Sequence, residues 1–207
     1  MEINEPAPKL YKQYMSVSEY LEFDRMADER HEYIDGEVFR MERAYEPPSN
    51  MAGARLRHVK IVSRLQGKIF QQLSGCEVLT NDLRVAIDTL SAYFYPDLII
   101  LCGKAQLQDR NEDVLLNPDV VIEVLSKGTK DYDLGFKSHR YMENPAIKEI
   151  AFVDSNAVGV TIQRKKHNNL WEYEKLSSQE DIFRLPSVGV TIGVREIYEG
   201  IDLLSRS

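Results

Sequence analysis

The stretch PDVVIEVLSK, residues 118–127, places a carboxylate inside the most apolar segment of the chain. The residues around Glu123 are typical of a strand that is buried on both faces. They are Val120, Val121, Ile122, Val124 and Leu125. An ionised carboxylate that is buried without a partner costs several kcal/mol or stays protonated. Glu123 therefore needs a partner, which is either a basic side chain or a bound cation.

Length and composition predict one globular domain, residues 16–207, after a loose N-terminal arm, residues 1–15. The longest apolar stretch falls short of a membrane span, and the polar N-terminus lacks a signal core. Cys76 and Cys102 are the two cysteines, which favours reduced thiols in the cytoplasm over a disulfide framework or a zinc site. The net charge of −7 disfavours a nucleic-acid binder, although a local basic face is compatible with it.

The order of patterns along the chain predicts an α/β fold with a mixed β-sheet flanked by helices. Ser16 and Glu19 fit a capping box at the start of a helix, and Asp35-Gly36 marks a hairpin turn. Residues 43–53 are predicted to be a mobile loop. Two further helices are expected at 55–73 and 130–144, and a short one near 194–204. Strands are predicted at 76–80, 83–87, 95–102, 118–126, 148–154, 159–165 and 170–176.

Two acids in this pattern can meet at one edge of the sheet. Asp97 opens one apolar strand, and Glu123 lies near the end of the next. If these strands are antiparallel neighbours, both carboxylates converge and suit a hard cation such as Mg²⁺ or Mn²⁺. Asp119 faces the same way as Glu123 but lies ~13 Å away along the strand. The alternatives are a turn role for Asp97 and a basic partner for Glu123.

These residues resemble the PD-(D/E)xK superfamily of restriction-endonuclease-like proteins. The segments YIDGEV, YPDLIIL, 118–144 and EIAFVD resemble its Uma-type family of bacterial endonucleases more closely. The resemblance covers residues 16–200, and residues 118–154 are its specific part. It implies a restriction-endonuclease-like fold, a divalent metal and a DNA substrate.

One departure from the superfamily pattern concerns its lysine, which falls two residues after the acid. Leu125 occupies that position here. Lys127, on the same strand, and Lys137, on the following helix, are the two candidates to replace it. The family resemblance favours Lys137, because the Uma-type pattern has a lysine at this place.

Other residues are assigned roles by the same reasoning. The resemblance makes Glu37 an additional acidic ligand or a partner of one, with Glu32 as the alternative across the hairpin. The carbonyl of Leu125 is a further candidate metal ligand, and His58 is a candidate contact for water or phosphate. The basic residues expected to contact phosphate are Arg55, Arg57, Lys60, Arg64, Lys127 and Lys130.

The sequence therefore predicts a Mg²⁺-dependent DNA endonuclease, and cleavage of both strands favours a homodimer. A catalytically silent nucleic-acid-binding or assembly module on the same fold is the main alternative, because Leu125 replaces the lysine and the net charge is acidic. A metal-dependent hydrolase of small phosphoesters is a third.

Overall fold

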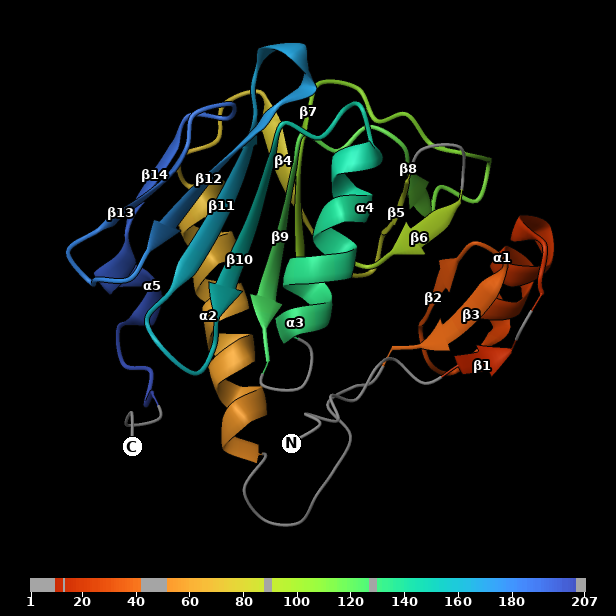
Figure 1. Cartoon of the computed structure of the whole chain (residues 1–207), viewed down its shortest axis with the longest axis horizontal. Coiled ribbons are helices and arrows are strands. Elements are labelled where there is room, and N and C mark those ends of the chain that lie inside the picture. Colours follow the sequence, from red (N-terminus) through yellow and green to blue (C-terminus); the bar gives the residue numbers. More distant parts are fainter. Residues whose placement is uncertain (1–9, 13, 42–51, 88–90, 127–129, 204–207) are drawn as a thin grey trace.

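The computed structural model describes residues 10–12, 14–41, 52–87, 91–126 and 130–203, with residues 10–12 and 52–55 described as backbone only. Its centre is a sheet of six strands in the order β12-β11-β10-β9-β7-β4 (Figure 1). The strands are β4 (Cys76–Thr80), β7 (Leu98–Cys102), β9 (Val120–Leu125), β10 (Glu149–Asp154), β11 (Val160–Lys165) and β12 (Trp171–Leu176). β9 and β10 are parallel, and the other neighbours are antiparallel. The predicted mixed sheet flanked by helices is confirmed.

Helices cover both faces of this sheet (Figure 1). On one face, α2 (Ala52–Phe70) packs Ile61, Leu65 and Ile69 against even-numbered residues of β7 and β9. On the other face, α4 (Ser138–Glu143) packs Tyr141 against odd-numbered residues of the same strands. The short helix α5 (Val194–Tyr198) and the hairpin of β13 (Ile182–Leu185) and β14 (Val190–Gly193) complete the α2 side. Because successive strand residues alternate faces, one apolar run fills two cores.

The N-terminal elements build a second sheet in the order β1-β3-β2-β6-β5-β8. Its strands are β1 (Leu10–Lys12), β2 (His31–Ile34), β3 (Glu37–Arg40), β5 (Arg84–Ala86), β6 (Ala92–Phe94) and β8 (Val114–Leu115). Asp35 and Gly36 both have positive φ, 49° and 96°, as the predicted β2–β3 turn requires. α1 (Val17–Met26) starts at the predicted capping box of Ser16 and Glu19.

A buried ionic network joins α1 to the second sheet. The carboxylate of Asp24 on α1 accepts hydrogen bonds from Arg84 of β5 at 2.6 Å and from the main chain of His31 at 2.8 Å. Arg84 also pairs with Asp113 at 2.6 Å. These contacts hold β2 in place, and β2 contributes Glu32 to the site described below.

The helix predicted at 130–144 contains a π-helical segment. α3 (Lys130–Tyr132) runs into η2 (Asp133–Lys137) and then α4, and the N–H of Ser138 donates to the carbonyl of Asp133. A π segment adds one residue to a helical turn, and such segments are frequent at functional sites. It sets the direction of Lys137, its last residue.

The structure differs from the sequence predictions at several places. The apolar side chains of Leu56 and Val59 on α2 are exposed, whereas Ile61 is fully buried. The helix ends at Phe70, three residues before the predicted end at residue 73. The loop expected at 43–53 lies largely outside the described residues. Within the expected arm, β1 pairs with β3, and Met15 is buried.

The two cysteines form a disulfide, so the prediction of separate thiols was wrong. Cys76 of β4 lies directly opposite Cys102 of β7, with their Cα atoms 4.1 Å apart. Only the neighbouring of these two strands brings the residues within bonding reach. The cysteines therefore no longer support a cytoplasmic location. No helix in the described part of the chain has the length and apolar character of a membrane span.

Candidate active site

Asp97 and Glu123 lie opposite each other on neighbouring strands. β7 runs antiparallel to β9, and Leu98 faces Ile122. Continuing this register by one residue brings Asp97 opposite Glu123. Asp97 lies one residue before β7 and contacts His58 of α2, whereas the partners of Glu123 come from η2 and α4. The predicted neighbouring of the two strands is confirmed, and Asp97 lies close enough to Glu123 for its charge to raise the pKa of that acid.

Glu123 is buried with two partners on one oxygen. Its Oε1 accepts a hydrogen bond of 2.7 Å from the hydroxyl of Tyr141 and lies 2.8 Å from Nζ of Lys137. Its Oε2 accepts no hydrogen bond from the described residues. The side chain of Glu123 as a whole is only 7% exposed.

Lys137 lies between several carboxylates. Besides Glu123, its Nζ contacts Oε1 of Glu32 at 2.9 Å and Oδ1 of Asp133 at 3.8 Å. The side chain of Lys137 is only 5% exposed. Oε2 of Glu32 accepts a hydrogen bond of 3.0 Å from the hydroxyl of Tyr132. One ammonium thus contacts three acids, from β2, β9 and η2, and is outnumbered by them.

The electrostatics of the cluster follow from its burial. Burial raises the pKa of Glu123 to about 7, and the charges of Asp97 and Asp133 add to the rise while Lys137 opposes it. Burial lowers the pKa of Lys137, but the carboxylates of Glu123 and Glu32 outweigh burial and hold that pKa well above its ordinary value. Lys137 is therefore cationic at neutral pH.

Asp97 has its own partners, on the side of β9 that faces β7. Its Oδ2 accepts a hydrogen bond of 2.7 Å from the N–H of Val124, and its Oδ1 lies 3.1 Å from Nε2 of His58. Burial lowers the pKa of His58, but the contact with Asp97 outweighs burial, and the net pKa lies above the ordinary value. Because the N–H and C=O of one strand residue point the same way, the carbonyl of Val124 also faces this side.

The carbonyl of Leu125 does not fit its predicted role as a metal ligand. It accepts hydrogen bonds from the N–H of Ser155 at 3.1 Å and from its hydroxyl at 2.7 Å. Carbonyls of successive strand residues alternate in direction, so that of Leu125 faces β10 and points away from Asp97. Val124 supplies the strand carbonyl nearer the two acids.

The described residues fit a divalent ion that keeps water ligands, and they do not fit a site with three or more side-chain ligands. The described part of the chain contains no group of three or more His, Cys, Asp or Glu side chains that could hold a metal ion. Asp97 and Glu123 provide two carboxylates, and Val124 provides a carbonyl. Mg²⁺ typically takes one or two carboxylates and keeps water or substrate phosphate as its other ligands.

Of the two hairpin acids considered, Glu32 reaches the cluster. Glu37 is half buried at the start of β3, opposite Ile34, whereas Glu32 contacts Lys137. Glu32 was predicted from the sequence only as the alternative to Glu37, and neither Asp133 nor Tyr141 was predicted as a site residue. Their spacing of four residues before and after Lys137 was the available signal, because such residues share a helix face.

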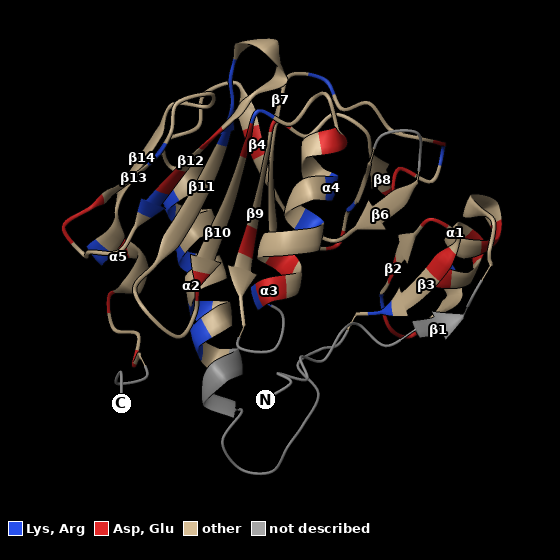
Figure 2. Ribbon diagram, in the orientation of Figure 1, with Lys and Arg blue, Asp and Glu red and all other residues tan. Residues whose placement is uncertain are grey.

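The predicted phosphate-binding residues fall into several groups. Lys60 is exposed on α2. Arg57 is half buried and makes long hydrogen bonds of 3.4 and 3.5 Å to Asp202 and Asn156. Its Nε has no partner among the described residues. Figure 2 shows the basic residues along α2 and the acidic residues on β9 and α3.

Other members of the predicted set are engaged elsewhere or lie outside the description. Arg64 donates to the carbonyls of Ile197 and Glu199 at the end of α5, so its predicted phosphate contact is replaced by a structural one. Lys130 pairs with Asp154 at 2.7 Å but keeps 47% of its side chain exposed. Lys127 and the side chain of Arg55 lie outside the described residues.

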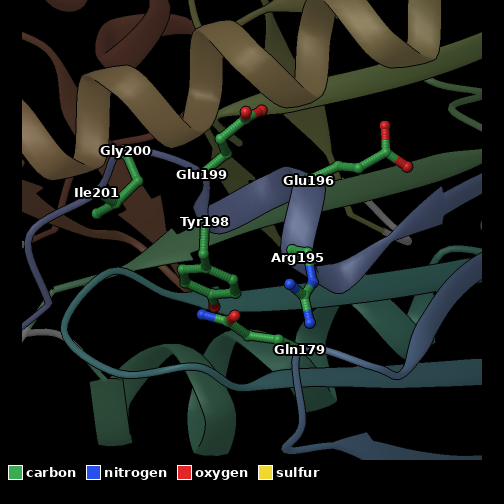
Figure 3. Close-up of a pocket in the computed structure, with 7 residues that line it drawn as sticks. All are labelled: Gln179, Arg195, Glu196, Tyr198, Glu199, Gly200 and Ile201. Carbon is green, nitrogen blue, oxygen red and sulfur yellow. The ribbon is translucent and has the colours of Figure 1, made fainter.

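A surface pocket lies beside α5 and is separate from these residues (Figure 3). None of the predicted site residues lines it. Its lining residues are Gln179, Arg195, Glu196, Tyr198, Glu199, Gly200 and Ile201. The pocket is therefore distinct from the cluster of Asp97, Glu123 and Lys137.

Comparison with known proteins identifies the family. Residues 17–195 match the model of the Uma2 family, described as "Putative restriction endonuclease". The chain belongs to this family. Among curated relatives, "Uncharacterized protein slr1290" of Synechocystis sp. is 30% identical over 199 residues, which is 95% of either chain. "Uncharacterized protein sll1609" of the same organism is 24% identical over 167 residues, covering 80% of this Uma2 chain and 89% of the relative.

A solved structure shares the fold. A crystal structure from Anabaena variabilis, described as "a putative nuclease belonging to DUF820", matches with a TM-score of 0.67 at 16% sequence identity. The match covers 89% of this chain and 97% of the other. The Uma2 chain therefore has the mixed α/β architecture of that protein.

Proposed function

We propose that the protein is a Mg²⁺- or Mn²⁺-dependent DNA endonuclease, with Asp97 and Glu123 as its metal-binding acids and Lys137 as its essential cation. Two observations carry the proposal: the strand register brings Asp97, just before β7, opposite Glu123 of β9, and Glu123 contacts Lys137 of η2. Membership of the Uma2 family supports nuclease chemistry. Cleavage of both strands would require two such sites, which favours a homodimer.

The bound metal would lower the pKa of a water ligand and offset negative charge on the reacting phosphate. Asp97 and Glu123 would hold the ion, and the carbonyl of Val124 would add an oxygen. Lys137 would stabilise negative charge that develops on the phosphate oxygens, because its ammonium is buried, cationic and fixed in direction by Glu32. Arg57, Lys60 and Lys130 would contact the DNA backbone outside the reacting group, without reading sequence.

The test compares two Pro-Asp acids of the same chain. Asp119 begins β9 at its opposite end, where it pairs with Lys148 at 2.6 Å. Asp97→Asn keeps an acceptor for the N–H of Val124 but removes a metal-binding charge, so we expect Mg²⁺-dependent cleavage of plasmid DNA to fall by about 100-fold or more. Asp119→Asn is the matched control and should retain activity.

The Lys137→Ala variant distinguishes the endonuclease hypothesis from the alternative of a catalytically silent binding module. The enzyme requires metal-dependent cleavage that is lost in Asp97→Asn and Lys137→Ala. DNA binding without cleavage, at equal affinity in the wild type and both variants, would instead identify the binding module that the acidic net charge of −7 and Leu125 favour. A panel of nucleotides and small phosphoesters tests the remaining hydrolase alternative.

A further inference from the structure

Tyr141 has a hydroxyl whose contact is not explained by core packing. The side chain is fully buried on α4, and its ring packs against Phe94 with centroids 5.4 Å apart. Its hydroxyl donates to Oε1 of Glu123 at 2.7 Å. A phenylalanine would fill nearly the same volume in the core. The hydroxyl is therefore needed only for its hydrogen bond to Glu123.

Two tyrosine–acid pairs surround Lys137, and they differ in one respect. Glu32 has both oxygens occupied, Oε1 by Lys137 and Oε2 by Tyr132. Glu123 receives both Lys137 and Tyr141 on Oε1. Its Oε2 has no partner among the described residues. Glu123 therefore keeps one oxygen for a ligand, and Glu32 keeps none.

We propose that Tyr141 is a positioning residue that presents Oε2 of Glu123 to the divalent cation. The inference rests on the proposed function, since it takes Glu123 as a metal ligand. The terminal torsion of a glutamate is broad and roughly two-fold, so a carboxylate held at one point can still turn. Two donors on Oε1, from η2 and α4, restrict that rotation and keep Oε2 directed away from Lys137 and Tyr141.

Removing the hydroxyl should weaken metal binding without removing any metal ligand. Hydrogen-bond partners of ligating carboxylates typically contribute about 10–100-fold in metal affinity. We therefore expect Tyr141→Phe to raise the Kd for Mn²⁺ by about 10–100-fold. Tyr132→Phe is the matched control, because it removes the equivalent hydroxyl from Glu32, and its Kd should stay within about twofold of wild type.

The experiment is a titration of each purified full-length variant with Mn²⁺, with free Mn²⁺ measured by electron paramagnetic resonance. Glu123→Gln gives the Kd expected when the ligand itself is lost, and thermal melts verify that each variant is folded. If Tyr141→Phe does not fold, Tyr141→His provides the second test. An imidazole N–H can donate to Oε1, so a folded His variant should bind Mn²⁺ within about threefold of wild type.

The outcomes separate the two proposals. Weaker binding in Tyr141→Phe but not in Tyr132→Phe supports the positioning role. Wild-type affinity in Tyr141→Phe, an equal loss in both tyrosine variants, or a loss of tenfold or more in a folded His variant overturns it. If the wild type and Glu123→Gln bind Mn²⁺ equally, the metal-binding role of Glu123 fails, and the proposed function fails with it.

Discussion

The replacement of Lys137 by methionine tests whether one lysine neutralises the acidic cluster. Methionine retains most of the apolar stem of lysine but removes the ammonium group. The side chain of Lys137 is 5% exposed, and those of Glu32 and Glu123 are 6% and 7% exposed. Loss of Lys137 therefore leaves two carboxylates almost entirely out of water, with Asp133 close by.

The expected loss of stability is large because the remaining charges stay buried. Removing one partner of a buried ion pair typically costs about 3–5 kcal/mol. For a chain of this length, each kcal/mol corresponds to about 2–4 °C in Tm, so we expect a decrease of about 6–20 °C. A surface ion pair would contribute about 1 kcal/mol or less.

The assay is urea unfolding followed by circular dichroism at pH 8 with EDTA present. Lys60→Met is the control, because Lys60 is exposed on α2 and its substitution should change stability by about 0.5 kcal/mol or less. Adding Glu32→Gln to Lys137→Met should restore part of the loss, since one of the unpaired carboxylates is then neutral. A Lys137→Met variant as stable as Lys60→Met would refute the buried cluster.

Three further predictions concern charge, covalent structure and DNA binding. In metal-free protein, the unfolding free energy of the wild type should fall by roughly 3 kcal/mol relative to that of Glu123→Gln as pH rises from about 4.5 to about 7. The reason is the raised pKa of Glu123: over this range the folded state keeps a proton that the unfolded chain releases. Parallel pH profiles of the two proteins in urea titrations would contradict this. Reduction of the Cys76–Cys102 disulfide should lower the unfolding free energy by about 3–4 kcal/mol, because the bond joins residues separated by 26 positions; unchanged denaturation curves with and without reductant would oppose it. In fluorescence anisotropy with labelled DNA, Lys60→Ala should reduce the slope of log affinity against log salt concentration by about 1. Arg64→Ala should leave that slope unchanged, because Arg64 binds carbonyls of α5. Equal slopes in the two variants would argue against a phosphate contact for Lys60 and a structural role for Arg64.

The local elements of the fold were predictable from the sequence. Asp35-Gly36 requires backbone angles that few other dipeptides adopt, and the Ser16–Glu19 capping box satisfies its own helix end. The apolar run around Glu123 predicted a buried strand, because consecutive apolar residues suit a strand that is covered on both faces. The approach of Asp97 to Glu123 was also predictable, because an acid at the start of one strand meets the end of its antiparallel neighbour.

The family resemblance pointed to Lys137 and left Glu32 as an alternative, and the tertiary structure decided which side chains surround that lysine. Glu32, Lys137 and Tyr141 come from segments far from β7 in the chain, and their meeting depends on how two sheets and a π segment pack. The Cys76–Cys102 bond and the use of Arg64 at α5 likewise depend on neighbours distant in sequence. Periodicity and turn chemistry act within a few residues, whereas these contacts depend on long-range packing that no short pattern encodes.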